Sequence, residues 1–383
     1  MRVGIQAGNL RSGGAITHLT GLLEAAEPEA SEIRKVVVWG SAECLGHLPR
    51  RKWLESRYVR ELDRGLCLRA LWEMTQLSRQ PEQHCDVLFV PGGVYLGNYR
   101  PFVAMSRNLL PFQSQELKPY LGSGLAAKYW MLAKAHVRTL RQAAGIIFLS
   151  DYPKDLILNK AAPVRGATRK IPHGVAERFR KPPRKPRGLD SCTPEKPFVL
   201  LYVSSQQRYK HHARVVEAVS HLRQEHGWPL KLVLAGKRAD RTSAKDLDSA
   251  LSRFDSDGEF VHSLGNHPFC NLHEVYHRAD AFIFASTCEN LSNILIEAMA
   301  AGLPIACSSS QPMPDILGSA GRYFDPRVPG ELEATLEAML LEPEQRAAMG
   351  AIAFQRAGLY CWRRTARETL DFLYQVATAE RGR

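Results

Sequence analysis

The stretch Ala281-Phe-Ile-Phe-Ala-Ser286-Thr-Cys-Glu289-Asn290-Leu-Ser292-Asn-Ile-Leu-Ile-Glu297-Ala-Met-Ala-Ala-Gly302-Leu-Pro304 decides the fold. It opens with an apolar run of strand length that ends at Ser286, where a polar loop begins. Ser292 can then cap a helix, which Gly302 and Pro304 end. A buried strand, a loop and a helix in this order predict one unit of a parallel sheet covered by helices.

Glu297 stands out because the predicted helix is apolar on nearly all sides. Its apolar residues are Leu291, Ile294, Leu295, Ile296, Ala298, Met299 and Ala300. Burying an ionised carboxylate costs several kcal/mol unless a partner offsets the cost. A carboxylate only accepts hydrogen bonds, so two vicinal hydroxyls of a ribose would suit Glu297. The alternative is an ion pair with a lysine or an arginine.

Glu289 lies on the loop at the mouth of the same strand, where it is expected either to accept from sugar hydroxyls or to be solvated. The free N–H groups of residues 291–294 and the positive end of the helix would face a diphosphate between the two acids. Asn290, Leu291 and Ser292 are therefore candidate donor contacts.

Short apolar runs alternate with helix-like stretches along the whole chain, which is typical of parallel sheets in α/β proteins. The runs are Val3–Ala7, Val36–Trp39, Val87–Val90, Phe102–Met105, Ile146–Leu149, Phe198–Val203, Leu232–Ala235, Phe260–His262, Ala281–Ala285 and Ile305–Cys307. The predicted fold is two Rossmann-like, doubly wound domains facing a central cleft, with the chemistry on loops beyond the carboxyl ends of the strands.

A length of 383 residues suggests two domains. Arg178–Arg187, rich in proline and basic residues, indicates an extended, solvated connector near the boundary. We expect an acceptor-side domain over 1–185, a nucleotide-sugar domain over 186–360, and a C-terminal segment over 361–383. The last segment contains an amphipathic helix, Trp362–Ala379, that can pack back on the first domain.

Several segments together resemble the group 1, retaining glycosyltransferases of GT-B fold. They are Glu289-x7-Glu297 with Ala-Met-Ala-Ala-Gly-Leu-Pro, Arg11-Ser-Gly13-Gly14-Ala-Ile-Thr-His18, Ile171-Pro-His173-Gly174-Val175, Tyr202-Val203 to Lys210, Met313-Pro-Asp-Ile-Leu and Tyr323-Phe-Asp-Pro. The resemblance implies transfer of a hexose-type sugar from a nucleotide diphosphate sugar to a glycan or lipid-linked acceptor. It also implies surface polysaccharide synthesis as the setting.

Site residues follow from these matches. The backbone of Gly13 and Gly14 can approach the donor phosphates without a Cβ in the way. Lys210, with Arg208 nearby, could neutralise the leaving diphosphate. Relatives often place an arginine where this chain has Ser205, which weakens the role of Arg208.

Three further residues of the first domain are candidate ligand contacts. His173 either contacts ligand or satisfies a turn. Relatives commonly carry a His-Asp pair after a first-domain strand, where this chain has Arg107-Asn108. No catalytic histidine is therefore assigned, and Arg107 and Asn108 are candidate contacts only.

The resemblance implies retention of configuration, with Glu289 at the sugar, Glu297 at the ribose and the leaving phosphate as the base. We expect no metal and no organic cofactor, because Lys210 could supply the positive charge that a metal supplies in other transferases. The alternatives are a GT-B-like sugar-nucleotide epimerase and a non-catalytic sugar-nucleotide binder.

A net charge of +12 favours an anionic partner. Nothing besides charge favours nucleic acid, so none is expected. The basic, aromatic stretches 50–60 and 126–138 either rest on anionic lipid headgroups or form solvated helix faces. Eight cysteines without a C-x-x-C pair indicate reduced thiols, and the sequence suggests a cytoplasmic protein, peripheral at the inner face of a membrane.

Overall fold

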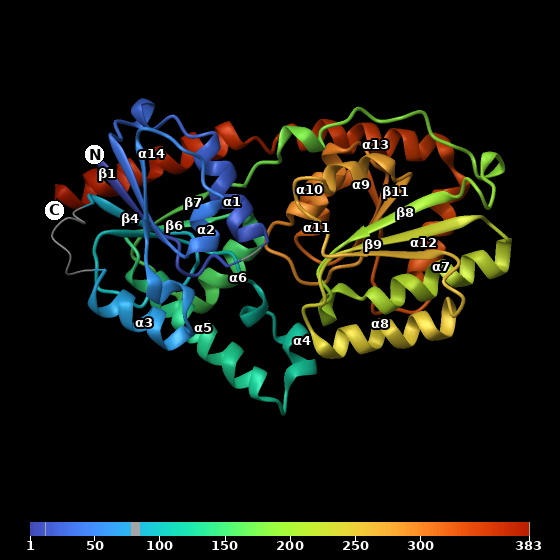
Figure 1. The fold of residues 1–383 in the computed structure, drawn as a ribbon, viewed down its shortest axis with the longest axis horizontal. Helices are drawn as coiled ribbons and strands as arrows, with labels where there is room; N and C mark the ends of the chain where they lie inside the picture. The colour runs from blue at the N-terminus through green and yellow to red at the C-terminus, as the bar shows by residue number, and fades with distance from the viewer. Residues whose placement is uncertain (12, 78–84, 383) are drawn as a thin grey trace. The chain divides into compact units, whose positions relative to one another are not determined.

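The computed structural model describes residues 1–11, 13–77 and 85–382, which form two compact units (Figure 1). Unit 1 comprises Met1–Gly174 and Cys361–Arg383, and unit 2 comprises Val175–Tyr360. The chain therefore passes between the units twice. Within unit 2, the N–H of Val175 donates to the carbonyl of Tyr360 (3.2 Å), so the segment that enters the unit is bonded to the segment that leaves it.

Unit 1 contains a seven-stranded parallel sheet in the order β3-β2-β1-β4-β5-β6-β7. Its strands are β1 (Arg2–Gln6), β2 (Lys35–Gly40), β3 (Leu54–Tyr58), β4 (Val87–Val90), β5 (Phe102–Met105), β6 (Gly145–Phe148) and β7 (Ala167–Lys170). Its helices are α1 (Gly14–Glu24), α2 (Ala42–Gly46), α3 (Leu66–Thr75), α4 (Ser114–Leu117), α5 (Gly124–Gln142), α6 (Asp151–Ala161) and α14 (Trp362–Arg381), with short 3-10 helices η1 (Pro28–Ser31), η2 (Arg60–Asp63), η4 (Leu110–Phe112) and η5 (Lys118–Tyr120).

Unit 2 contains a six-stranded parallel sheet in the order β10-β9-β8-β11-β12-β13. Its strands are β8 (Phe198–Val203), β9 (Leu230–Ala235), β10 (Val261–Gly265), β11 (Ala281–Phe284), β12 (Ile305–Ser308) and β13 (Gly321–Phe324). Its helices are α7 (His212–His226), α8 (Arg241–Phe254), α9 (Leu272–Arg278), α10 (Asn293–Ala300), α11 (Met313–Leu317), α12 (Glu331–Leu341) and α13 (Pro343–Ala357), with η6 (Glu177–Phe179), η7 (Leu189–Ser191), η8 (Arg208–Lys210) and η9 (Gly318–Ala320).

Each sheet reverses its strand order once. The reversal lies between β1 and β4 in unit 1, and between β8 and β11 in unit 2. Ligands of doubly wound sheets bind beyond the carboxyl ends of the strands at such a point. The loops after β8 and β11 are therefore where the second unit is expected to bind a ligand.

The predicted α/β class is confirmed, and ten predicted strands coincide with observed strands to within a few residues. Three strands were missed: β3, β7 and β13, each at the edge of its sheet. Edge strands carry polar and half-exposed residues, as in Leu-Glu-Ser-Arg-Tyr of β3. The stretch 50–60, which we considered as a helix face, thus contains an edge strand.

The basic segment Arg178–Arg187 is not a solvated connector. Arg184 donates to the carbonyl of Ala279, and Arg187 forms an ion pair with Asp280 (3.3 Å). The N–H of Lys181 donates to the carbonyl of Ala300 at the end of α10 (2.9 Å). The segment belongs wholly to unit 2, so the division falls at 174/175 rather than at the expected 185/186.

Helix α14 belongs to unit 1, where it packs against α1, η1 and β4. The predicted apolar stripe is buried on it, including Ala366, Leu370 and Leu373. Trp362, at its first turn, packs over Gly21 of α1, where a Cβ would approach the indole ring to 2.5 Å. In the described part of the chain, no helix is long and apolar enough to cross a membrane.

Candidate functional site

Lys210 and Glu289 meet at the carboxyl ends of β8 and β11. Lys210 ends η8, which follows β8, and Glu289 lies on the loop after β11. The Nζ atom of Lys210 donates to Oε1 of Glu289, and the two side chains are only 7% and 15% exposed. An ammonium has three donors and a carboxylate two oxygens, so this ion pair retains capacity for further hydrogen bonds to a ligand.

Neighbouring groups fix the backbone around Lys210. The buried Tyr202 hydroxyl donates to the Lys210 carbonyl (2.5 Å), and the N–H of Thr287 donates to the Tyr209 carbonyl (2.9 Å). His211 follows in a left-handed conformation (φ 51°), with Nε2 3.2 Å from Oγ1 of Thr287. The loops after the two strands are therefore bonded directly to each other, which positions the lysine.

Glu297 is buried in α10, 4% exposed, as the sequence predicts. Its Oε2 accepts a hydrogen bond from the hydroxyl of Tyr276 (3.0 Å), and no described group donates to Oε1. Burial raises the pKa of Glu297 to about 7, although the Tyr276 hydrogen bond and the charge of Arg178 oppose the shift. This carboxyl is thus held near its titration point at neutral pH.

The N-terminus of α10 lies beside these acids. Asn290, Leu291 and Ser292 are all buried, and Ser292 is at the N-cap position. The prediction that its hydroxyl caps the helix is wrong, because the side chain makes no capping hydrogen bond. The N–H groups of the first turn have no partner within the helix, so they can serve an anion.

The guanidinium of Arg208 contacts two residues at the start of α8. Its Nη2 donates to Oγ1 of Thr242 (2.9 Å), and its Nε lies 3.9 Å from the carboxylate of Asp240 at the start of α8. These contacts hold the guanidinium at α8, in line with the doubt that Ser205 raised.

Gly13, the N-cap residue of α1, has a backbone conformation, φ 60° and ψ −144°, that is almost confined to glycine. An added Cβ would meet no atom within 4 Å, so open space lies over the loop. Arg107, after β5, donates from Nη2 to the carbonyl of Gly14 (2.6 Å). Burial lowers the pKa of Arg107 to about 10, which leaves it charged at neutral pH.

His173 and Asn108 have local roles in this structure. His173 is 1% exposed, and its ring stacks on Trp362 at 6.0 Å and meets His18 edge-on at 6.2 Å. Asn108 is exposed and accepts from the N–H of Leu110 (3.2 Å). We considered that His173 either contacts ligand or satisfies a turn. Its burial and its ring contacts favour the second interpretation.

The sequence alone did not point to several polar groups near the strand ends. The hydroxyl of Tyr276 on α9 is one of them, and no sequence motif signals it. Ser286 is fully buried, and its Oγ has no partner among the described residues. In unit 1, burial raises the pKa of Glu73 to about 7; its Oε2 accepts from the N–H of Leu96 after β4 (3.1 Å). A polar residue directly after an apolar strand is the signal that could have found Ser286, whereas Glu73 lies within α3 and gives no such signal.

Comparison with known proteins gives one family and a consistent fold. Residues 190–356 match the family model of glycosyl transferases group 1. O-antigen chain mannosyltransferase B of Escherichia coli is 25% identical over 171 residues, which cover 45% of this chain and 44% of the relative. The match therefore spans less than half the length of that curated relative.

Solved structures resemble the whole chain at low identity. Sucrose-phosphate synthase from Thermosynechococcus elongatus superposes with a TM-score of 0.76 at 16% identity, covering 99% of this chain and 100% of that one. HepE of Anabaena, solved in complex with UDP-glucose, gives a TM-score of 0.71 at 14% identity, with both chains fully covered. At such identity, these likenesses show the fold.

Proposed function

We propose that the chain is a sugar-transferring enzyme, because residues 190–356 match the family model of glycosyl transferases group 1 and the two sheets have the GT-B topology. It moves a hexose-type sugar from a nucleotide diphosphate sugar to a glycan or lipid-linked acceptor. The observation that carries the proposal is the Lys210–Glu289 pair beside the uncapped N-terminus of α10, at the strand reversal of the second sheet.

In this proposal the diphosphate lies against cationic and N–H donors. Lys210 and the first turn of α10 stabilise the negative charge that develops as the diphosphate leaves. Glu289 accepts from hydroxyls of the sugar while it keeps Lys210 oriented. Arg208 is not proposed to bind the diphosphate, since its guanidinium contacts Thr242 and Asp240.

Glu297 accepts from the ribose hydroxyls. Its Oε1 has no donor among the described residues, and a diol offers two. A buried carboxyl with a pKa of about 7 releases its proton readily when such donors arrive, which favours the ionised form in the complex.

We further propose that transfer retains the anomeric configuration. Neither Glu289 nor Glu297 acts as a glycosidase nucleophile, because one is paired with Lys210 and the other lies buried in α10. The leaving phosphate oxygen takes the proton of the acceptor hydroxyl.

The acceptor is proposed to bind unit 1 and to belong to surface polysaccharide synthesis. Resemblance to the O-antigen chain mannosyltransferase supports that setting. Exposed Trp130 and Met131 on α5, beside Lys128, support peripheral contact with an anionic membrane.

A thermal-shift panel of UDP-, GDP-, ADP- and dTDP-sugars tests the donor site, with UDP-glucose first because HepE binds it. A ligand bound only by the folded state raises the melting temperature. One nucleotide class should stabilise the wild type, Glu297→Gln should weaken the effect, and the exposed Glu259→Gln should not. If no nucleotide sugar binds, the proposal fails.

Product analysis separates the two alternatives. Transfer gives a new glycoside and a nucleoside diphosphate, a sugar-nucleotide epimerase gives a changed nucleotide sugar, and a non-catalytic binder gives neither. Detection of the glycoside supports the proposed function, and either of the other results overturns it.

A further inference from the structure

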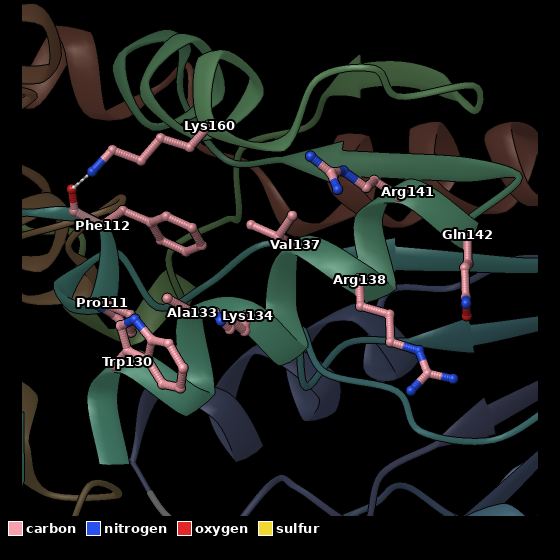
Figure 2. A pocket seen from close by; sticks show the side chains of 10 residues that line it. All are labelled: Pro111, Phe112, Trp130, Ala133, Lys134, Val137, Arg138, Arg141, Gln142 and Lys160. Carbon is pink, nitrogen blue, oxygen red and sulfur yellow. Dashed lines mark hydrogen bonds between the residues drawn. The ribbon is translucent and has the colours of Figure 1, made fainter. Parts of the chain in front are cut away.

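A cationic groove lies along one face of α5 in unit 1, apart from the candidate donor site of unit 2 (Figure 2). Its volume is about 650 Å³, within the range of sites for small molecules. Trp130, Lys134, Val137 and Arg138 line it from α5 at helical spacing, and Phe112 of η4 forms part of the opposite wall.

Hydrogen bonds to backbone carbonyls hold the walls of the groove together. Lys160 of α6 donates to the carbonyl of Phe112 (2.6 Å), as the dashed line in Figure 2 shows. Arg141 donates to the carbonyls of Ala161 (2.9 Å) and Ala162 (3.0 Å). A carbonyl does not neutralise a cation, so both side chains leave net positive charge beside the groove.

Lys134 and Arg138 add charge that no described acid neutralises. The Nζ atom of Lys134 lies 3.7 Å from the ring centroid of Trp130, and Arg138 makes no ion pair within the described ranges. None of the ten lining residues is acidic. The groove therefore suits a negatively charged ligand.

Apolar surface continues from the groove along the same helix and the turn before it. Trp130 and Met131 are each 59% exposed, and Leu121 is 70% exposed. Exposed aromatic and aliphatic side chains beside lysines are typical of surfaces that sit at a lipid interface. A nucleic acid would find a single exposed indole here and no row of stacking aromatics.

We propose that this groove binds one anionic phospholipid taken from a bilayer. Its phosphate lies at Lys134 and Arg138, and one acyl chain lies over Phe112, Ala133 and Val137. This site rests on the membrane contact in the proposed function and names the lipid that makes it; vesicle binding is measured without sugar transfer, so either proposal can fail without the other.

The test uses the full chain and vesicles of phosphatidylcholine with or without phosphatidylglycerol, some with brominated acyl chains. Brominated phosphatidylglycerol should quench tryptophan fluorescence, and Trp130→Phe should remove most of the quenching. The double substitution Lys134→Gln/Arg138→Gln should weaken vesicle binding about 25-fold, since each cation near the surface contributes about 1 kcal/mol.

Two further variants separate the groove from charge in general. Arg363→Gln/Arg367→Gln removes the same charge from exposed residues of α14, elsewhere in unit 1, and should change binding less than about threefold. Ala133→Phe keeps every cation and adds no tryptophan but fills the groove, and should reduce quenching.

The proposal is overturned if the Arg363/Arg367 variant loses as much binding as the Lys134/Arg138 variant, or if phosphatidylcholine alone binds equally well. It is also overturned if the lipid-free protein is a dimer that Trp130→Ala dissociates, because the face would then join two copies of the chain. Circular dichroism of each variant shows whether a loss of vesicle binding is caused by misfolding. If the Lys134→Gln/Arg138→Gln variant misfolds, the variant Lys134→Arg/Arg138→Lys, which keeps both charges, should retain binding.

Discussion

The ammonium group of Lys210 and the carboxylate of Glu289 form a largely buried ion pair that joins the loops after β8 and β11. Removing one partner of such a pair leaves an uncompensated buried charge, which costs about 3–5 kcal/mol. Lys210→Met or Glu289→Gln alone should therefore destabilise unit 2 by about that amount. The double variant should lose less than the sum of the two, as urea denaturation would measure.

Activity should respond differently from stability in the same three variants. All of them should lose about 100-fold or more in sugar transfer, because both groups contact the donor in the proposed complex. Full recovery of transfer in the double variant would mean that the pair is structural and that the donor binds elsewhere.

Donor binding should strengthen as the pH rises through about 7. Glu297 has a pKa of about 7 in the free protein, and ribose hydroxyls favour its ionised form. Calorimetry with the stabilising nucleotide sugar at about pH 6 and about pH 8 should show tighter binding at the higher pH, with proton release near pH 7. Glu297→Gln should bind weakly with no such dependence; an equal slope in this variant would assign the proton to another group.

Stability should change with pH in the opposite sense. The pKa of Glu297 rises from 4.5 unfolded to about 7 folded, so the folded state holds the proton over that interval. The stability contributed by the protonated form is complete below about 4.5 and is lost as the pH rises through about 7, a loss of about 3 kcal/mol. Urea titrations of the ligand-free protein across this interval should show a shallower fall for Glu297→Gln than for the wild type. A control, Glu259→Gln, should follow the wild type.

The central strands could be predicted because parallel strands buried on both faces appear as continuous apolar runs, as in Ala281–Phe284. The edge strands β7 and β13 give no such signal, since one side of each meets solvent and tolerates residues such as Arg169 and Arg322. The prediction that the basic segment Arg178–Arg187 is a solvated connector was wrong for a related reason. Arginines usually indicate solvent, yet Arg184 and Arg187 are bonded to carbonyls and to Asp280.

Within the site, the burial of Glu297 followed from its helical neighbours, but its partner did not. Tyr276 lies on α9, and only the packing of α9 on α10 brings its hydroxyl to Glu297. The pairing of Lys210 with Glu289 was equally hidden, because it depends on β8 and β11 being neighbours. Sequence indicated which residues are candidates for the chemistry, and the strand order determined which of them meet.

Gly13 should tolerate no side chain, although there is space for one. Its backbone conformation is nearly exclusive to glycine, and Gly13→Ala should cost about 1–3 kcal/mol in unfolding free energy. Gly46→Ala is a matched control, because Gly46 also has open space around it and no positive φ. Denaturation of both variants measures the difference, and equal stability would contradict the conformational argument.

Arg346 should hold the basic segment on unit 2. It is 2% exposed, and its guanidinium donates to the carbonyls of Met339 (2.9 Å), Leu340 and Arg187 (2.5 Å). Arg346→Met removes these donors and leaves buried carbonyls unpaired, at a cost of about 1–3 kcal/mol for each group. The segment 181–187 should then be cleaved faster by trypsin, because it detaches more often from the unit. Arg241→Met, at an exposed arginine, is the control and should leave the cleavage rate unchanged. An unchanged rate in the Arg346 variant would show that the contacts of Arg184 and Arg187 hold the segment without the help of Arg346.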